Sequence, residues 1–153
     1  CKMWHDSTYA AIRRDYVAKG QLRIAYLNFP LQMHAHAMPA AEASMCASVQ
    51  GKFWEMHDRL FDTQQRWQDL VDAFPAFESH ARAIGLALPE WRQCMDSHVM
   101  QRLILADQQR GQQIGVSKTP WFFVGDESLA GAAPLDAFRA AIQRQQAKAA
   151  KRP

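Results

Sequence analysis

Cysteines are the residues of this sequence with the clearest chemical capacity, because a thiolate is both a nucleophile and a partner in disulfide exchange. The sequence contains three of them, Cys1, Cys46 and Cys94. An odd number allows one disulfide and leaves one thiol over. Cys1 stands at the start of a segment with helical spacing, where unpaired backbone N–H groups and the helix dipole stabilise negative charge. Cys1 is therefore the first candidate for redox chemistry, beside the common alternative of a structural cysteine.

Two stretches of the sequence resemble parts of one enzyme family. Residues 1–6 read Cys-Lys-Met-Trp-His-Asp, and residues 115–124 read Gly-Val-Ser-Lys-Thr-Pro-Trp-Phe-Phe-Val. The first is similar to the active site of DsbA-like thiol–disulfide oxidoreductases, which belong to the thioredoxin superfamily. There a Cys-Pro-x-Cys motif continues into a basic residue, an aromatic and often a histidine. The second is similar to the family's Gly-Val-x-x-Thr-Pro-x-Phe-Phe-Val segment.

The resemblance continues through most of the chain. Residues 28–43 resemble the stretch that follows the family's buried strand, and residues 50–58 resemble its next helix. The similarity extends from Cys1 to about Ile142. One departure is Ala35, which stands where the family usually has a proline between two histidines.

On this resemblance, Cys1 is the second, resolving cysteine of the active site. The nucleophilic cysteine would lie three residues upstream, so we expect the sequence to be truncated within the active-site motif. Pro120 corresponds to a cis-proline that lies against the active-site disulfide. Thr119 and Pro120 would shape a groove where an extended substrate pairs with exposed backbone. His5, one turn after Cys1, either helps to hold a thiolate or is a solvated helix-face histidine.

Cys46 and Cys94 both fall in a region with helical spacing. They are either two small buried side chains or a structural disulfide that joins two helices. The second interpretation fits a family that works in oxidising compartments. Closing a loop of this length would stabilise the fold by about 4 kcal/mol in the chain-entropy account of disulfides.

Other classes of site and partner find little support. The histidines at positions 5, 34, 36 and 57 do not form the compact Cys/His pairs of structural zinc, so we predict no metal site. The predicted chemistry requires no dissociable cofactor. The net charge is only +3 and the basic residues are scattered, which does not indicate nucleic acid as a partner. No apolar run is long enough for stable membrane insertion.

Apolar spacing predicts the elements that would position these residues. A helix begins at Cys1 and ends near Gly20. The apolar run Leu22–Phe29 predicts a strand buried on both faces. Helical spacing then continues from 37 to 111. A hairpin around residues 121–130, with its turn at 125–126, and a helix that starts at Pro134 complete the chain.

This order predicts an α/β domain with helices on both faces of a small mixed sheet. The resemblance implies a thioredoxin-like fold with an inserted all-helical domain and its first strand or strands outside this sequence. The predicted parts are 1–36 and 112–153 for the thioredoxin-like domain and 37–111 for the insertion. Without its first strand, the sheet would expose unpaired backbone groups. We therefore expect residues 1–153 alone to be marginally stable, to aggregate, or to borrow a strand from another copy.

The resemblance implies an enzyme that exchanges disulfides with protein substrates, although the given piece, with one active-site sulfur, would be inactive by itself. Its partners would be reduced or unfolded exported proteins and a redox protein that resets the active site. The location would be periplasmic or otherwise extracytoplasmic. Two alternatives use the same fold: a peptide-binding or chaperone-like module without redox activity, and a glutathione-using isomerase.

Overall fold

The computed structural model describes residues 1–151 of the chain. These residues divide into two compact units. Unit 1 combines residues 1–26 with the chain from residue 115 onward, and unit 2 comprises residues 27–114. The predicted three-part division, with its boundaries after residues 36 and 111, follows the same order and stays a proposal. Residues 152 and 153 of its last part lie outside the described residues.

Unit 1 begins with one continuous helical run. It comprises α1 (Lys2–Trp4), the π-helical η1 (His5–Tyr9), α2 (Ala10–Ile12) and the π-helical η2 (Arg13–Val17). The run stops at Gly20, where the N–H groups of Gly20 and Gln21 bond the Val17 and Tyr16 carbonyls. Gly20 has a φ of +67°, a conformation that glycine adopts without a Cβ penalty. The predicted helix and its stop are confirmed; the π-helical turns were not predicted.

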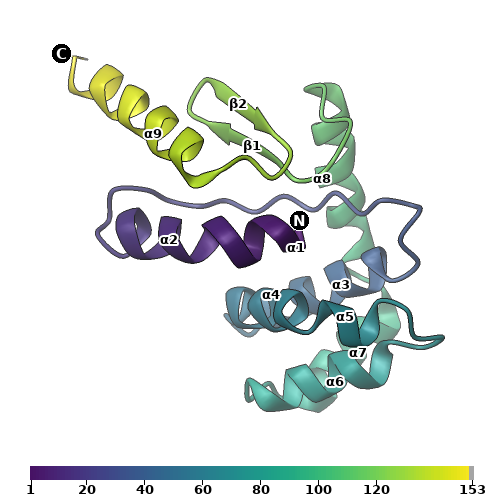
Figure 1. The fold of residues 1–153 in the computed structure, drawn as a ribbon. Helices are drawn as coiled ribbons and strands as arrows, with labels where there is room; N and C mark the ends of the chain where they lie inside the picture. Colours follow the sequence, from purple (N-terminus) through teal and green to yellow (C-terminus); the bar gives the residue numbers. More distant parts are fainter. Residues whose placement is uncertain (152–153) are drawn as a thin grey trace. The chain divides into compact units, whose positions relative to one another are not determined.

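The predicted strand Leu22–Phe29 is wrong. After Gly20 the chain runs back beside the first helix as an extended segment, but it forms no strand within residues 1–151 (Figure 1). Nor is it buried on both faces, since only Leu22 and Ile24 pack against the core of unit 1 and alternate with exposed residues. A strand needs a hydrogen-bonded neighbour, and no described strand lies beside this segment. The sheet is accordingly two-stranded, not a larger mixed sheet.

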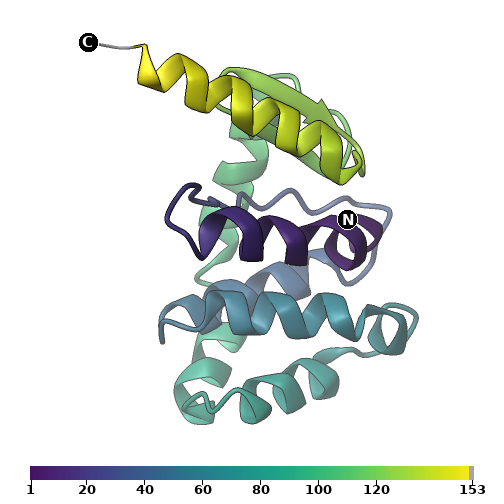
Figure 2. The ribbon, with the colours of Figure 1, turned by 60° about the vertical axis from the view of Figure 1, so that its left-hand side comes forward.

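The predicted hairpin is confirmed. Strand β1 (Trp121–Val124) pairs antiparallel with β2 (Glu127–Ala130), with Val124 opposite Glu127. The two-residue turn contains Gly125 with a φ of +61°, as expected for a tight hairpin connection. Helix α9 (Leu135–Ala150) follows, with Pro134 as its N-cap, and covers one side of the hairpin (Figures 1 and 2).

Unit 1 is held together by apolar packing and by ion pairs between α9 and the hairpin. Ile12, Phe138 and Ile142 form its buried centre, so the first helix and α9 share one core. Arg144 Nη2 lies 2.7 Å from Glu127 Oε2, and Arg144 Nε contacts both carboxylate oxygens of Glu127. This bidentate ion pair holds β2 against α9 in a more specific orientation than a single hydrogen bond would.

All regular secondary structure of unit 2 is helical. Its elements are α3 (Ala37–Ser48), α4 (Phe53–Asp62), α5 (Gln64–Trp67), α6 (Phe74–Ala83), α7 (Leu88–Ser97) and α8 (Gln101–Gln113). The predicted helical block is thereby confirmed, although the short α5 was not predicted and α8 continues past Gly111. None of the helices within residues 1–151 has both the length and the apolarity to cross a membrane.

The core of unit 2 lies between α3, α4, α6 and α7. Phe77, Met56 and Trp91 are fully buried there. The Trp91 indole N–H donates to the Ala43 carbonyl at 3.2 Å, which ties α7 to α3 and satisfies a buried donor. The extended chain before α3 is joined to α8, because Asn28 bonds Asp107 through both its backbone N–H and its side chain.

Candidate active site

Cys1 is an exposed free thiol at the beginning of a helix. It is the N-cap of α1, and the first backbone hydrogen bond runs from the His5 N–H to the Cys1 carbonyl at 2.9 Å. The N–H groups of residues 2–4 come before intrahelical bonding begins, and they carry the partial positive charge of the helix terminus. No acidic side chain occupies these three positions. This environment favours the thiolate form of Cys1.

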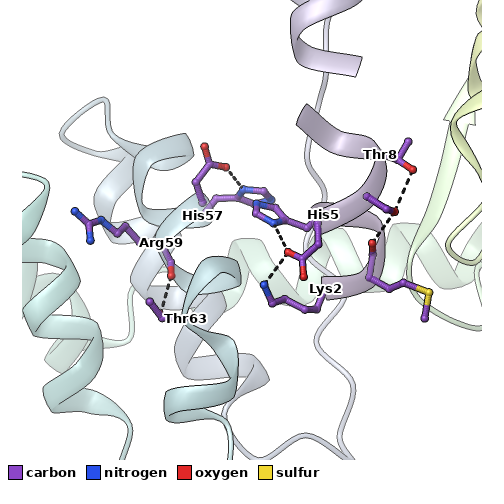
Figure 3. Close-up of polar contacts among 10 residues, drawn as sticks. Lys2, His5, Thr8, His57, Arg59 and Thr63 are labelled. Atoms are coloured by element: carbon purple, nitrogen blue, oxygen red, sulfur yellow. Dashed lines mark hydrogen bonds and ion pairs between the residues drawn. The ribbon is translucent and has the colours of Figure 1, made fainter. Parts of the chain in front are cut away.

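The side chains that follow Cys1 are joined by Asp6. Lys2 Nζ donates to Asp6 Oδ1 at 2.7 Å, and His5 Nδ1 lies 3.3 Å from the same oxygen (Figure 3). The hydrogen bond from Lys2 is the main cause that lowers the pKa of Asp6, so this carboxylate is ionised at neutral pH. The His5 ring stacks on Tyr9 at 5.1 Å, and its side chain is only 10% exposed. His5 is thus not freely solvated, and a role beside the Cys1 thiolate stays a proposal.

Thr119 and Pro120 lead directly into β1. The peptide bond between them is cis. The Pro120 carbonyl accepts a hydrogen bond from the Gly131 N–H at 2.8 Å, which extends the hairpin by one link. Within residues 1–151 the backbone N–H and carbonyl of Thr119 have no partner. Because proline has no N–H of its own, the groups available to pair with another chain at this point belong to Thr119.

An aromatic cluster joins the helix that carries Cys1 to the strand that follows Pro120. The Trp4 ring lies 4.4 Å from Phe122 and 5.6 Å from Phe138, centroid to centroid, and Phe122 meets Phe138 edge-on at 4.8 Å. Trp4 is three residues after Cys1, and Phe122 is two residues after Pro120. The same packing therefore fixes the helix start and the cis-proline segment within unit 1. Trp4 belongs to the motif of residues 1–6, but the sequence did not indicate this packing role.

The structure contains the disulfide considered for Cys46 and Cys94. The two residues are 48 positions apart, their Cα atoms lie 5.8 Å apart, and the bond joins α3 to α7 within unit 2. Cys46 is buried in the core of that unit. Cys1, the third cysteine, is left as a free thiol.

A model of the family described as thioredoxin matches residues 1–144. The chain belongs to the thioredoxin family. The fold of this thioredoxin-family chain is like that of solved DsbA proteins of Wolbachia pipientis. With alpha-DsbA1 T172V the TM-score is 0.80 at 19% identity, over 97% of this chain and 80% of that one. With the thiol–disulfide exchange protein alpha-DsbA2 the TM-score is 0.72 at 15% identity, over 88% of this chain and 73% of that one. The fold is thus thioredoxin-like with an inserted helical domain, as predicted.

Two relatives with known names are similar in sequence. Disulfide bond formation protein D of Bacillus subtilis is 21% identical over 152 residues, which cover 95% of this thioredoxin-family chain and 66% of that protein. Na(+)/H(+) antiporter NhaA 3 of Salinispora tropica is 32% identical over 146 residues, which cover 94% of this chain but only 21% of the antiporter. The chain therefore spans less than two thirds of either relative.

The predicted site residues of this thioredoxin-family chain fall into two groups. Cys1, His5, Thr119 and Pro120 all lie in unit 1. The other two cysteines lie in unit 2, where they are already paired with each other. Only Cys1 is available as a thiol for exchange with another molecule.

Proposed function

We propose that the protein is a thiol–disulfide oxidoreductase in which Cys1 is the resolving cysteine. The observation that carries the proposal is a free, exposed thiol at a helix N-terminus, on a helix packed through Trp4 against the strand after a cis-proline. The helix start favours the reactive thiolate. The Wolbachia alpha-DsbA2 protein, named for thiol–disulfide exchange, has the same fold.

The second sulfur would come from a cysteine three residues before Cys1. In the reducing direction, its thiolate attacks a substrate disulfide, forms a mixed disulfide and releases one substrate thiolate. The Cys1 thiolate then attacks the sulfur of that cysteine, closes the enzyme disulfide and releases the second substrate thiolate. Two electrons pass from the enzyme dithiol to the substrate disulfide. The reverse sequence oxidises a substrate dithiol by the same steps.

Thr119 and Pro120 would hold an extended substrate beside these sulfurs. The N–H and carbonyl of Thr119 are available for strand-like pairing, a mode of peptide recognition that uses backbone hydrogen bonds for affinity. His5, which lies one turn after Cys1 and beside Asp6, would help to hold the Cys1 thiolate. The partners would be reduced or unfolded exported proteins and a redox protein that resets the active site, in an extracytoplasmic compartment. The Bacillus relative is likewise named for disulfide bond formation.

The test uses the gene product that includes the coding region upstream of Cys1. With a cysteine three residues before Cys1, this protein should accelerate reduction of insulin by dithiothreitol. The Cys1→Ser variant should lose the resolving step and accumulate a mixed disulfide with substrate, visible as a mass increase that dithiothreitol reverses. Ser7→Ala, an exposed change on the same helical run, is the matched control and should keep wild-type activity and show no adduct.

Two results would overturn the proposal. One is a residue other than cysteine at the upstream position, which would favour a peptide-binding module built on the Thr119–Pro120 segment. The other is equal activity of the wild type and Cys1→Ser with no trapped adduct, which would remove Cys1 from the chemistry.

A further inference from the structure

Unit 2 contains a cavity of about 330 Å³ beside α3, α6 and α7. Its apolar lining includes Pro39, Phe74, Phe77 and Met95, of which the last two are buried. This volume is at the lower end of the range for ligand pockets in proteins. The cavity therefore fits one side chain or a small molecule better than a large organic ligand.

The polar lining of the cavity is acidic. Glu42, Asp72 and Asp96 face it together with His36 and His98, and no lysine or arginine does. An anionic ligand would meet carboxylates and no permanent cation, so the charge of the lining is complementary to a positively charged group.

Glu42 is the deepest of these carboxylates, with only 2% of the residue exposed. His98 Nδ1 lies 2.9 Å from Oε1, and Gln101 Nε2 donates to Oε2 at 3.3 Å. Neither partner is a permanent cation, and Glu42 has no lysine or arginine partner within residues 1–151. A buried carboxylate without a cation is costly. The His98 side chain is 62% exposed, so it can move aside for an incoming cation.

Two exposed apolar residues come directly before lining residues in the chain. His36, a lining residue, lies with Nε2 2.7 Å from the Leu70 carbonyl. Leu70 is nearly half exposed and Val71 fully exposed, and both directly precede the lining residue Asp72. Exposed apolar residues on the segment that supplies Asp72 suit a polypeptide, which brings apolar neighbours with its basic residue, better than a free cation.

We propose that this cavity binds a lysine or arginine side chain of a polypeptide partner, with the alkyl stem against Pro39 and Phe74 and the charged head at Glu42. The aromatic lining adds attraction for a cation that approaches a ring face. This binding site lies wholly in unit 2 and does not depend on disulfide exchange at Cys1.

The test is an NMR titration of the 153-residue chain with blocked pentapeptides. The probe is acetyl-Leu-Ala-Lys-Ala-Leu-amide, followed through the imidazole signals of His36 and His98 and the amides of residues 70–72. A peptide with norleucine in place of lysine keeps the stem and removes the charge, and we expect it to bind at least about tenfold more weakly. Free n-butylamine has the stem and charge of lysine without a polypeptide, and it should also bind at least about tenfold more weakly.

Substitutions of single carboxylates test which of them binds the charged head of the lysine peptide. Glu42→Gln keeps the shape of the side chain and should weaken binding of the lysine peptide at least about tenfold. If it does not fold, Asp96→Asn at the exposed edge of the cavity should still weaken binding about threefold at low salt. Glu90→Gln makes the same change on an exposed position of α7 outside the cavity and should bind as the wild type does.

Three outcomes would overturn the proposal. Equal affinity for the lysine and norleucine peptides would make the cavity an apolar site. Equal affinity for the lysine peptide and n-butylamine would assign it to small amines. If the His36 and His98 signals do not shift at millimolar peptide, the peptide does not bind in the cavity. None of these results bears on the insulin assay.

Discussion

At the scale of single residues, the three cysteines differ in their position on a helix and in their burial, and these differences decide what each thiol can do. Cys1 caps a helix, is exposed and has the unbonded N–H groups of the first turn beside it. Cys46 lies inside α3, is buried and is consumed by a disulfide with Cys94. One cysteine is therefore left as a free thiol, whereas the other two form a structural cross-link.

His80 should make folding sensitive to pH. The Thr63 hydroxyl donates to the Arg59 carbonyl at 2.8 Å, so His80 Nε2, also 2.8 Å from that hydroxyl, acts as the donor to it (Figure 3 shows the Thr63–Arg59 bond). Burial, and then the positive charges of Arg59 and Arg66, lower the pKa of His80 below its ordinary value of 6.5. As pH falls below about 6.5, the unfolded chain takes up the proton first, so the free energy of unfolding should fall.

Urea unfolding at several pH values between 8 and 5 checks this expectation. His80→Gln keeps a side-chain N–H donor and cannot titrate, so it should flatten the decline of stability below about pH 6.5. Ser79→Ala, an exposed neighbouring change, should leave the decline as it is in the wild type. A His80→Gln protein with an unchanged pH profile would contradict the assignment.

At the scale of elements, the helices were predictable, but the strand predicted at Leu22–Phe29 was wrong. The helical stripes of Phe77 and Ala81 or of Phe138 and Ile142 are local patterns, and each helix satisfies its own backbone. The hairpin was equally local, because Gly125 and its neighbour fix the turn. The run Leu22–Phe29 has strand composition, but a strand forms only beside a partner, and within residues 1–151 none is paired with it. The sequence of this run indicates that it can pair as a strand, but it does not show that a partner strand is present.

The disulfide between α3 and α7 should contribute about 4 kcal/mol to the stability of unit 2, given the 48 positions between its cysteines. The Cys46→Ala, Cys94→Ala double variant should therefore unfold at a lower urea concentration. The fluorescence of Trp67 and Trp91, both buried in unit 2, reports this transition.

Reduction of the wild-type protein with dithiothreitol separates the cross-link from packing, because it opens the bond and keeps both sulfur atoms. The reduced wild type should lose most of the stability that the double variant loses. A loss below about 1 kcal/mol in both would show that α3 and α7 are held by other contacts, among them the bond from Trp91 to Ala43.

At the scale of the whole molecule, sequence motifs identified the candidate thiol site but not the cavity in unit 2. Cys1, Thr119 and Pro120 lie in short ordered motifs, so a resemblance could identify them. Glu42 lies in the stretch 28–43 that resembles the family, but that resemblance does not pair it with His98, 56 positions away. Their pairing depends on how α3 and α7 pack, which apolar spacing does not specify.

The two units should differ in stability. Unit 2 has a large buried core and a disulfide, whereas unit 1 has a three-residue buried centre and a two-stranded sheet. Two strands are marginal in water unless they pack against other elements, and here α9 supplies that packing. Within residues 1–151, one edge of β1 has no neighbouring strand and residues 22–25 form no strand, so both can pair with another chain. Unit 1 should therefore open first, and the chain should self-associate through it.

Native-state hydrogen exchange tests this order of opening, because it reports the opening free energy of each amide. Amides of β1 and β2 should exchange at least about tenfold faster than those of α3 and α7, a difference of about 1.4 kcal/mol. Light scattering after size exclusion should show self-association that grows with concentration. Reducing the Cys46–Cys94 bond should destabilise unit 2 alone and so reduce the difference in exchange rate between the two sets of amides. Equal protection in both units, with one sharp and reversible transition of a monomer, would mean that unit 1 needs no further strand.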